Sequence, residues 1–151
     1  MKDRIQNAVD NFNSGYNCAQ SVFLAFADMY GFTHEQACGI SASFGGGIGR
    51  MRETCGAACG MFILAGLEKS AQNGSDAESK EANYALVQTL AERFKERNGS
   101  LVCRELLGLD QAEPVISKPE ARTEAYYAVR PCPKIVEEAA TIWSEHLLRK
   151  K

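Results

Sequence analysis

The chain has 151 residues, of which 45% are hydrophobic and 24% charged, and its formal net charge is −2. This length and composition are typical of a globular protein with a core of its own, so we expect a single domain over residues 1–151. With 17 Lys and Arg against 19 Asp and Glu, the chain lacks the basic surplus of proteins that bind nucleic acid or anionic membranes. We therefore expect neither nucleic acid nor a membrane as a partner.

The first residues, MKDRIQNAVDNFNSGYN, contain no apolar segment suited to a signal peptide, and no run in the chain reaches membrane-spanning length. These features predict a cytoplasmic protein. In a reducing compartment, the six cysteines are expected to be thiols, metal ligands or redox centres rather than structural disulfides.

Apolar residues three and four positions apart, bracketed by capping residues and glycines, predict helices in almost every segment. Three N-termini carry capping-box pairs, which are Asn17 with Gln20, Thr33 with Gln36, and Ser75 with Glu78. The last helix begins at a proline, which suits the first helical position. The expected helices cover residues 3–12, 17–31, 33–44, about 55–72, 76–98, a short stretch at CRELLG, and a final helix from Pro133, with partial helix at EAYYAV.

The stretch CGAACGMFILAGL is apolar on every side, which is typical of a buried helix. Its small residues Gly56, Ala57, Ala58 and Gly60 would let neighbouring helices approach closely. We therefore predict an all-α, single-domain helical bundle of about six to seven helices, with the helix at about 55–72 buried at its centre.

Four of the six cysteines fall at predicted helix N-termini: Cys18, Cys55, Cys103 and Cys132. The unpaired N–H groups and positive dipole end of a helix stabilise an anion there and lower the pKa of a thiol. Three of these cysteines have an arginine close in sequence, which is Arg52 before Cys55, Arg104 after Cys103 and Arg130 before Cys132. The other two, Cys38 and Cys59, fall in second turns among apolar neighbours, where a cysteine usually serves as a small hydrophobe.

The glycine-rich stretch GGGIGRMRET, residues 45–54, leads directly into Cys55. It has no Lys-Ser/Thr pair, no GxGxxG spacing and no preceding strand, so it is not typical of a phosphate-binding loop. Glycines with positive φ can bring backbone N–H groups against an anionic, sulfur-rich centre; a flexible connector is the alternative. The glycines expected at such a centre are Gly45, Gly46, Gly47, Gly49 and Gly56.

Five stretches occur in the order NCAQSV, FGGGIGR, CGAACG, CRELLG and RPCPKIV. Together they resemble the C_GCAxxG_C_C family, whose members are described as redox-active. The resemblance covers about residues 13–136. In CGAACG, the first two letters of the family's GCAxxG are exchanged.

The resemblance implies that the motif cysteines are Cys18, Cys55, Cys103 and Cys132, with Cys59 at a variable position and Cys38 outside the motif. Related domains occur in split-Soret cytochromes, joined to haem segments and associated with an iron–sulfur centre. This chain has no CxxCH, so covalent haem is not expected.

Three functions remain open. The four motif cysteines suit an iron–sulfur cluster or another metal, such as zinc, used for electron transfer to a partner protein. Alternatively, Cys55, Cys103 and Cys132 perform metal-free thiol–disulfide chemistry, and any enzyme of this kind would be an oxidoreductase. The third alternative is a helical interaction module without chemistry. We also expect a homodimer, in which the irregular segment at 109–130 reaches a second subunit.

Overall fold

The computed structural model describes residues 1–69, 74–109 and 114–150. Within these ranges the chain forms helices and no strand, so the predicted all-α class is confirmed. The helices of these ranges are α1 (Lys2–Asn13), α2 (Cys18–Leu24), η1 (Ala27–Tyr30), α3 (His34–Ser41), η2 (Ala42–Phe44), α4 (Gly56–Lys69), α5 (Ala77–Asn98), α6 (Cys103–Leu106), α7 (Glu124–Val129) and α8 (Cys132–Arg149), where η marks a 3₁₀-helix.

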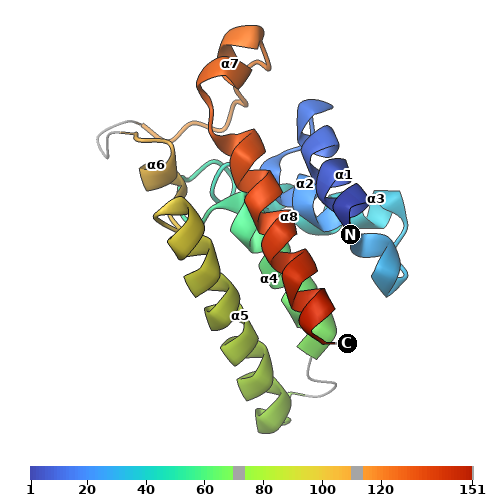
Figure 1. The fold of residues 1–151 in the computed structure, drawn as a ribbon. Coiled ribbons are helices and arrows are strands. Elements are labelled where there is room, and N and C mark those ends of the chain that lie inside the picture. The colour runs from blue at the N-terminus through green and yellow to red at the C-terminus, as the bar shows by residue number, and fades with distance from the viewer. Residues whose placement is uncertain (70–73, 110–113, 151) are drawn as a thin grey trace.

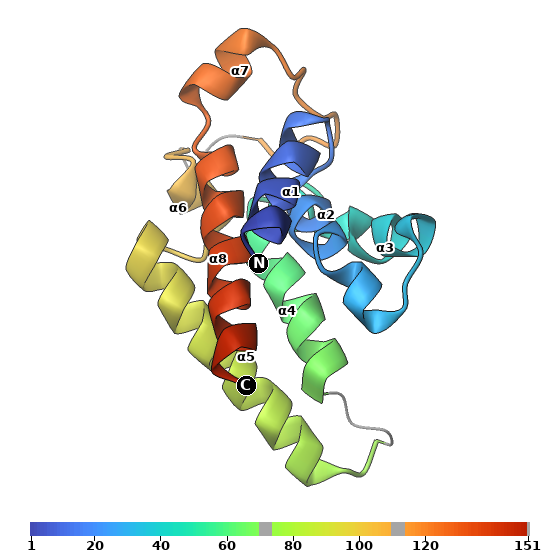
Figure 2. The same ribbon diagram turned by 45° about the vertical axis from the view of Figure 1, so that its right-hand side comes forward.

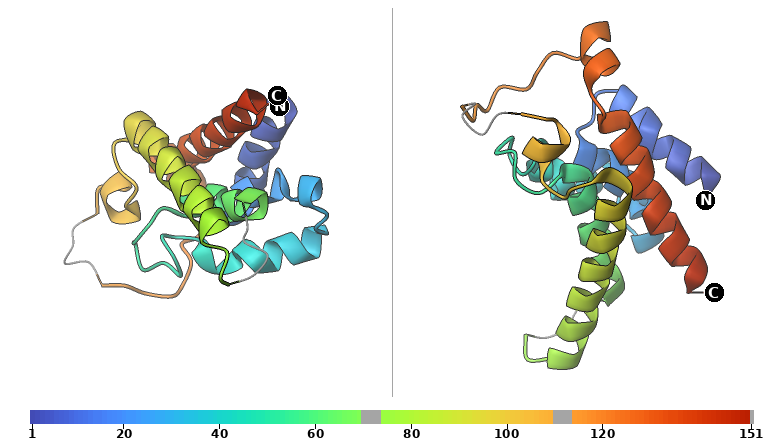
Figure 3. Two further views of the ribbon diagram at one scale, coloured as in Figure 1. Left: turned by 90° about the horizontal axis from the view of Figure 1, so that it is seen from below. Right: turned by 60° about the vertical axis from the view of Figure 1, so that its left-hand side comes forward.

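The bundle is organised around α4. This helix packs against α2, α5 and α8, and α8 also packs along α1 (Figure 1). The turned view in Figure 2 shows α1 to α3 on one side of α4 and α8, and α5 on the other. The glycine-rich loop, α6 and α7 all lie at the end of the bundle where α4 and α8 begin (Figure 3).

The prediction that α4 is the buried central helix is confirmed. Eight of its residues are buried: Gly56, Ala57, Ala58, Cys59, Gly60, Met61, Leu64 and Ala65. Around them pack the large apolar side chains of the neighbouring helices, including Val22, Phe23, Leu90, Phe94, Val136 and Trp143. The described helix begins at Gly56 and ends at Lys69, and the predicted continuation to residue 72 lies outside the described residues.

Two predicted capping boxes are confirmed and the third is wrong. At α2, the Asn17 side chain accepts the N–H of Gln20 at 2.9 Å, and the Gln20 side chain accepts the N–H of Asn17 at 3.1 Å. Thr33 and Gln36 form the same arrangement at α3. At α5 the N-cap is Asp76, whose carboxylate accepts both the N–H and the hydroxyl of Ser79. A carboxylate that receives two donors replaces the expected pair at Ser75 and Glu78.

Two predicted boundaries also change. The helix expected over 17–31 ends at Leu24, and a 3₁₀-helix over Ala27–Tyr30 follows, with Gly31 as its C-cap. The carbonyl of Ala25, at the junction, accepts a hydrogen bond from Arg4 at 2.8 Å. At α8, Cys132 is the first helical residue and Pro131 the N-cap, one position earlier than expected. No helix in the described residues is long and apolar enough to cross a membrane.

The close contact between α2 and α4 predicts a sharp difference between two glycines of α4. A Cβ at Gly60 would lie 2.9 Å from the Cβ of Val22 and 3.0 Å from the carbonyl oxygen of Ala19, whereas a Cβ at Gly66 meets nothing within 4 Å. We expect Gly60→Ala to lower the free energy of unfolding by about 1–3 kcal/mol through overpacking. Gly66→Ala, the matched control, should raise it by about 0.5–1 kcal/mol through helix propensity.

Urea denaturation of the two variants and the parent chain measures both effects. Equal stability changes in the two variants would show that α2 and α4 do not approach each other this closely.

Candidate functional site

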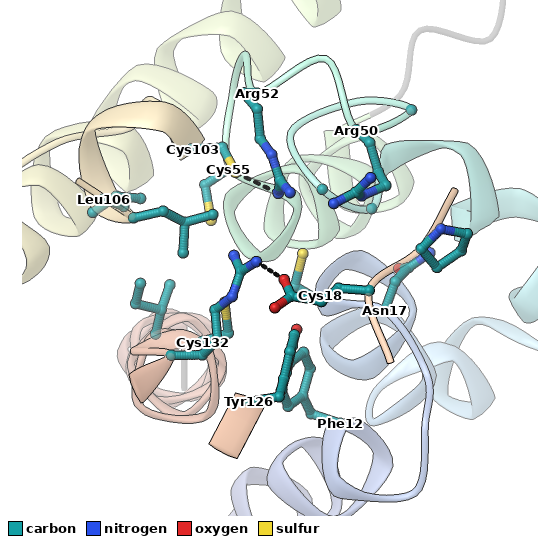
Figure 4. Close-up of a pocket in the computed structure, with 18 of the residues that line it drawn as sticks. Phe12, Asn17, Cys18, Arg50, Arg52, Cys55, Cys103, Leu106, Tyr126 and Cys132 are labelled. Atoms are coloured by element: carbon teal, nitrogen blue, oxygen red, sulfur yellow. Dashed lines mark hydrogen bonds and ion pairs between the residues drawn. The ribbon is translucent and has the colours of Figure 1, made fainter. Parts of the chain in front are cut away.

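Four cysteines from four separate segments line one cavity of about 410 Å³ (Figure 4). Cys18 is the first residue of α2, Cys55 directly precedes α4, Cys103 begins α6 and Cys132 begins α8. These are the four positions that the sequence placed at helix N-termini. Residues more than a hundred positions apart in the chain therefore face the same space.

Cys55 and Cys103 are held together by the backbone. The Cys55 N–H donates to the carbonyl of Leu101 at 2.7 Å, and the Cys103 N–H donates to the carbonyl of Glu53 at 2.6 Å. An isolated antiparallel bridge joins Thr54 and Val102 between them. This short pairing fixes the start of α4 beside the start of α6.

Cys18 is brought to the cavity by the absence of a side chain at Gly56. A Cβ at Gly56 would collide with the Cys18 sulfur and with the carbonyl oxygen of Phe44. Any larger residue at position 56 would therefore push α2, and Cys18 with it, away from α4.

The glycine-rich loop has a left-handed backbone. Five consecutive residues, Gly46 to Arg50, have φ between 57° and 75°, and Arg52 has φ 62°. Positive φ was expected for the glycines and is found at Gly46, Gly47 and Gly49, but Gly45 is extended. The non-glycine residues Ile48, Arg50 and Arg52 share it, which the sequence did not indicate, and such conformations are strained for them.

The five predicted glycines occupy two kinds of position. Gly45, Gly46 and Gly49 line the cavity. Gly47 stands behind it, where a Cβ would lie 2.6 Å from the Cβ of Cys103, and Gly56 stands behind Cys18. The loop thus contributes both cavity wall and close backbone packing.

Burial is the main influence on the pKa of three of the cavity thiols. It raises the pKa of Cys18, raises that of Cys55 well above the usual value, and raises that of Cys132 to about 12. The backbone N–H of Gly46 acts in the opposite direction on Cys18, and those of Ala57 and Ala58 on Cys55. The expectation that helix N-termini lower the pKa of these free thiols is therefore wrong in sign for all three, because desolvation outweighs the dipole.

Arginines surround the same cavity, though not in the pairs that sequence adjacency suggested. Arg52 reaches across to donate to the sulfur of Cys103 at 3.7 Å rather than to its neighbour Cys55. Arg130 favours the ionised form of Cys132, as expected, and also forms an ion pair with Glu120. Arg104 lines an adjoining pocket.

The sequence analysis missed two cavity arginines, Arg50 and Arg122. Arg50 follows the glycines directly, so its place in the loop was a usable signal. Arg122 lies in the irregular segment, where no sequence pattern indicated a site residue. Its guanidinium stacks 4.2 Å from the ring centre of Phe12 and donates to the carbonyls of Phe12 and Tyr16.

These contacts of Arg122 fold the segment before α8 back onto its own chain. The hydroxyl of Tyr127 also donates to the carbonyl of Asn13. Tyr126 and Glu120 then close one wall of the cavity. The described part of this segment is thus occupied within the subunit, and the expected homodimer stays a prediction.

The remaining two cysteines lie outside the cavity lining. Cys59 is buried in α4, its thiol donates to the carbonyl of Thr54 at 3.9 Å, and burial raises its pKa to about 12. Cys38 lies on α3 and is half-buried. The burial of Cys59 agrees with its interpretation as a small hydrophobe, and the same interpretation of Cys38 stays a prediction.

The described His, Cys, Asp and Glu side chains are the residues that could serve as ligands of a metal ion. No group of three or more of them is placed to hold a metal ion. The four cysteines share a cavity without converging on one point.

The raised pKa of Cys132 predicts slow alkylation in the metal-free protein. At pH 8 we expect iodoacetamide to modify Cys132 at least about 100-fold more slowly in the native than in the urea-unfolded chain, because only the thiolate reacts. The native rate should keep rising about tenfold per pH unit up to about pH 10, whereas the unfolded rate levels off near the ordinary thiol pKa of 9.0. Peptide mass spectrometry measures both rates, and a native rate that levels off near the same pH as the unfolded rate would contradict the assignment.

Comparison with protein families matched residues 16–146 to the family described as "Putative redox-active protein (C_GCAxxG_C_C)". Comparisons with curated proteins and with solved structures gave no match. The family match spans most of the chain and includes all four cavity cysteines. The chain therefore belongs to the C_GCAxxG_C_C family of redox-active proteins.

Proposed function

We propose that this protein transfers electrons through an iron–sulfur cluster held by Cys18, Cys55, Cys103 and Cys132. The observation that carries the proposal is that these four thiols, from four segments, line one cavity of about 410 Å³. Four cysteines are the usual ligand set of [2Fe–2S] and [4Fe–4S] clusters.

Four thiols from four segments around one cavity suit a cluster. A tetrahedral zinc site brings every sulfur within about 2.3 Å of one point, and no described group of side chains is placed to hold a metal ion. A cluster has several metal atoms, so its ligands stand further apart. When bound, a cluster supplies reversible one-electron transfer.

The residues around the thiols suit an anionic centre. The N–H of Gly46 faces Cys18, the N–H groups of Ala57 and Ala58 face Cys55, and Arg52 donates to Cys103. Such donors stabilise thiolate ligands and tune the potential of the centre they hold. Phe12 and Ile135 add apolar wall to the same cavity.

Metal-free thiol–disulfide chemistry is the second candidate, and one observation favours it. The thiol of Cys103 lies near enough to Cys18 and Cys55 to raise the pKa of both by charge repulsion, and Cys18 raises the pKa of Cys55 in the same way. The raised pKa of Cys18 and Cys55 weighs against it, because attack on a disulfide requires a thiolate. In either case the electrons pass to a partner protein, and an enzymatic role would be that of an oxidoreductase.

The test compares one cavity cysteine with one outside it. Protein purified without oxygen should absorb visible light and contain iron and acid-labile sulfide in comparable amounts. Cys18→Ser should lose at least about 80% of the iron because one of four ligands is gone. Cys38→Ser, the matched control on α3, should retain the iron of the parent chain.

The parent protein could instead be colourless and free of iron and sulfide, with thiols that oxidise reversibly to disulfides and are restored by a dithiol reagent. That result would rule out the cluster and support the thiol–disulfide function. Thiols inert to oxidation would leave only an interaction module. Equal loss of iron in Cys18→Ser and Cys38→Ser would remove the assignment of ligands to the cavity.

A further inference from the structure

A second, smaller pocket of about 170 Å³ adjoins the cysteine cavity. The two share four wall residues, namely Arg50, Arg52, Glu120 and Arg130. The remaining lining of the outer pocket comes from Arg104 and from the apolar residues Leu109, Pro114 and Ile116. The wall that the two pockets share thus contains three arginine side chains, of which Arg50 and Arg52 are labelled in Figure 4.

Positive charge is concentrated in this pocket although the whole chain carries a net charge of −2. Among the described lining residues, four are arginines and one, Glu120, is acidic. Glu120 is engaged by Arg130. Three of the arginines, Arg50, Arg52 and Arg130, thus share this described wall with one carboxylate.

Each arginine of the shared wall also uses only one of its two terminal nitrogens in the hydrogen bonds of the described residues. The Nη1 of Arg50 donates to the carbonyls of Ile116 and Lys118, the Nη1 of Arg52 to Cys103, and the Nη2 of Arg130 to Glu120. In the described part of the chain, the other terminal nitrogen of each of these arginines has no hydrogen-bond partner. Guanidinium groups with a free edge are well suited to oxyanions, which accept two parallel N–H bonds.

The close approach of these arginines is energetically unfavourable. Arg50 and Arg52 sit in left-handed backbone conformations that are strained for residues with a side chain. Burial lowers the pKa of Arg50, and repulsion from Arg52 and Arg130 lowers it further. Bound negative charge would offset this repulsion.

We propose that the outer pocket binds a small oxyanion, the size of a phosphate or a short dicarboxylate, against Arg50, Arg52 and Arg130. The site goes beyond electron transfer, because it recognises a small molecule next to the cavity. Arg52 touches both spaces, so a bound anion changes the charge felt at Cys103.

The experiment is isothermal titration calorimetry of the purified full chain at low ionic strength, with inorganic phosphate as one probe and oxalate as the other. We expect saturable 1:1 binding of at least one probe, and their relative affinity separates a tetrahedral from a planar preference. Arg50→Gln and Arg52→Gln should each weaken binding at least about tenfold, because each loses a charge-assisted bond. Arg149→Gln, at the exposed end of α8, should bind as the parent does.

Glu120→Gln provides the opposite test, which cannot be mimicked by misfolding. Removing the acidic residue of the described wall should tighten binding at least about threefold, because it frees Arg130 and removes repulsion of the anion. Urea denaturation verifies that each variant is folded. No binding by the parent, equal weakening in Arg149→Gln, or unchanged affinity in Glu120→Gln would overturn the site.

The result is independent of the cluster. Titration of Cys18→Ser measures anion binding in a chain that cannot complete the proposed ligand set. Binding in both Cys18→Ser and the iron-loaded parent supports the site. Binding by Cys18→Ser that is absent from the iron-loaded parent would overturn it, because the arginines would then only balance the charge of the cluster.

Discussion

The contact of α2 with the start of α4 is the constraint on which the site depends. Gly56 lies against Cys18 and Phe44, and one turn later Gly60 lies against Ala19 and Val22. Two glycines on one face of α4 let the helices approach at backbone distance, where a methyl group would separate them. This contact places Cys18 beside Cys55 and gives the glycine-rich loop a fixed base.

Desolvation and local dipoles act against each other in this cavity. Helix starts and loop N–H groups are directed at the sulfurs, yet burial keeps the free thiols of Cys18, Cys55 and Cys132 protonated. Such a site stays unreactive until something removes the thiol protons, and binding to a metal does so directly. The same donors that fail to ionise a free thiol are well placed to stabilise a bound thiolate.

Much of the fold followed from local signals in the sequence. The capping boxes at Asn17 and Thr33 and the all-apolar stretch of α4 are short-range patterns, so they predicted helix starts and the buried helix correctly. The early end of α2 was not predicted, because no glycine or proline marks it, and the contact of Arg4 with the Ala25 carbonyl there joins residues more than twenty positions apart. The four cysteines were selected by helix position, but their shared cavity depends on long-range backbone pairing between residues 53–55 and 101–103. The sign of the pKa shifts of Cys18, Cys55 and Cys132 follows from their burial, which no sequence pattern supplies.

The pairing of Thr54 with Val102 also has a consequence for the order of events during synthesis. Cavity walls come from residues as early as Phe12 and as late as Ile135. A chain still emerging from the ribosome can form α1, α2 and α4, but it has no closed cavity until α6 and the beginning of α8 have left the exit tunnel. Insertion of any cofactor into the finished cavity therefore has to follow the formation of α6 and of the beginning of α8. Truncation before α8 would remove Cys132 and Ile135 from the cavity, together with the helix that packs against α1, α4 and α5.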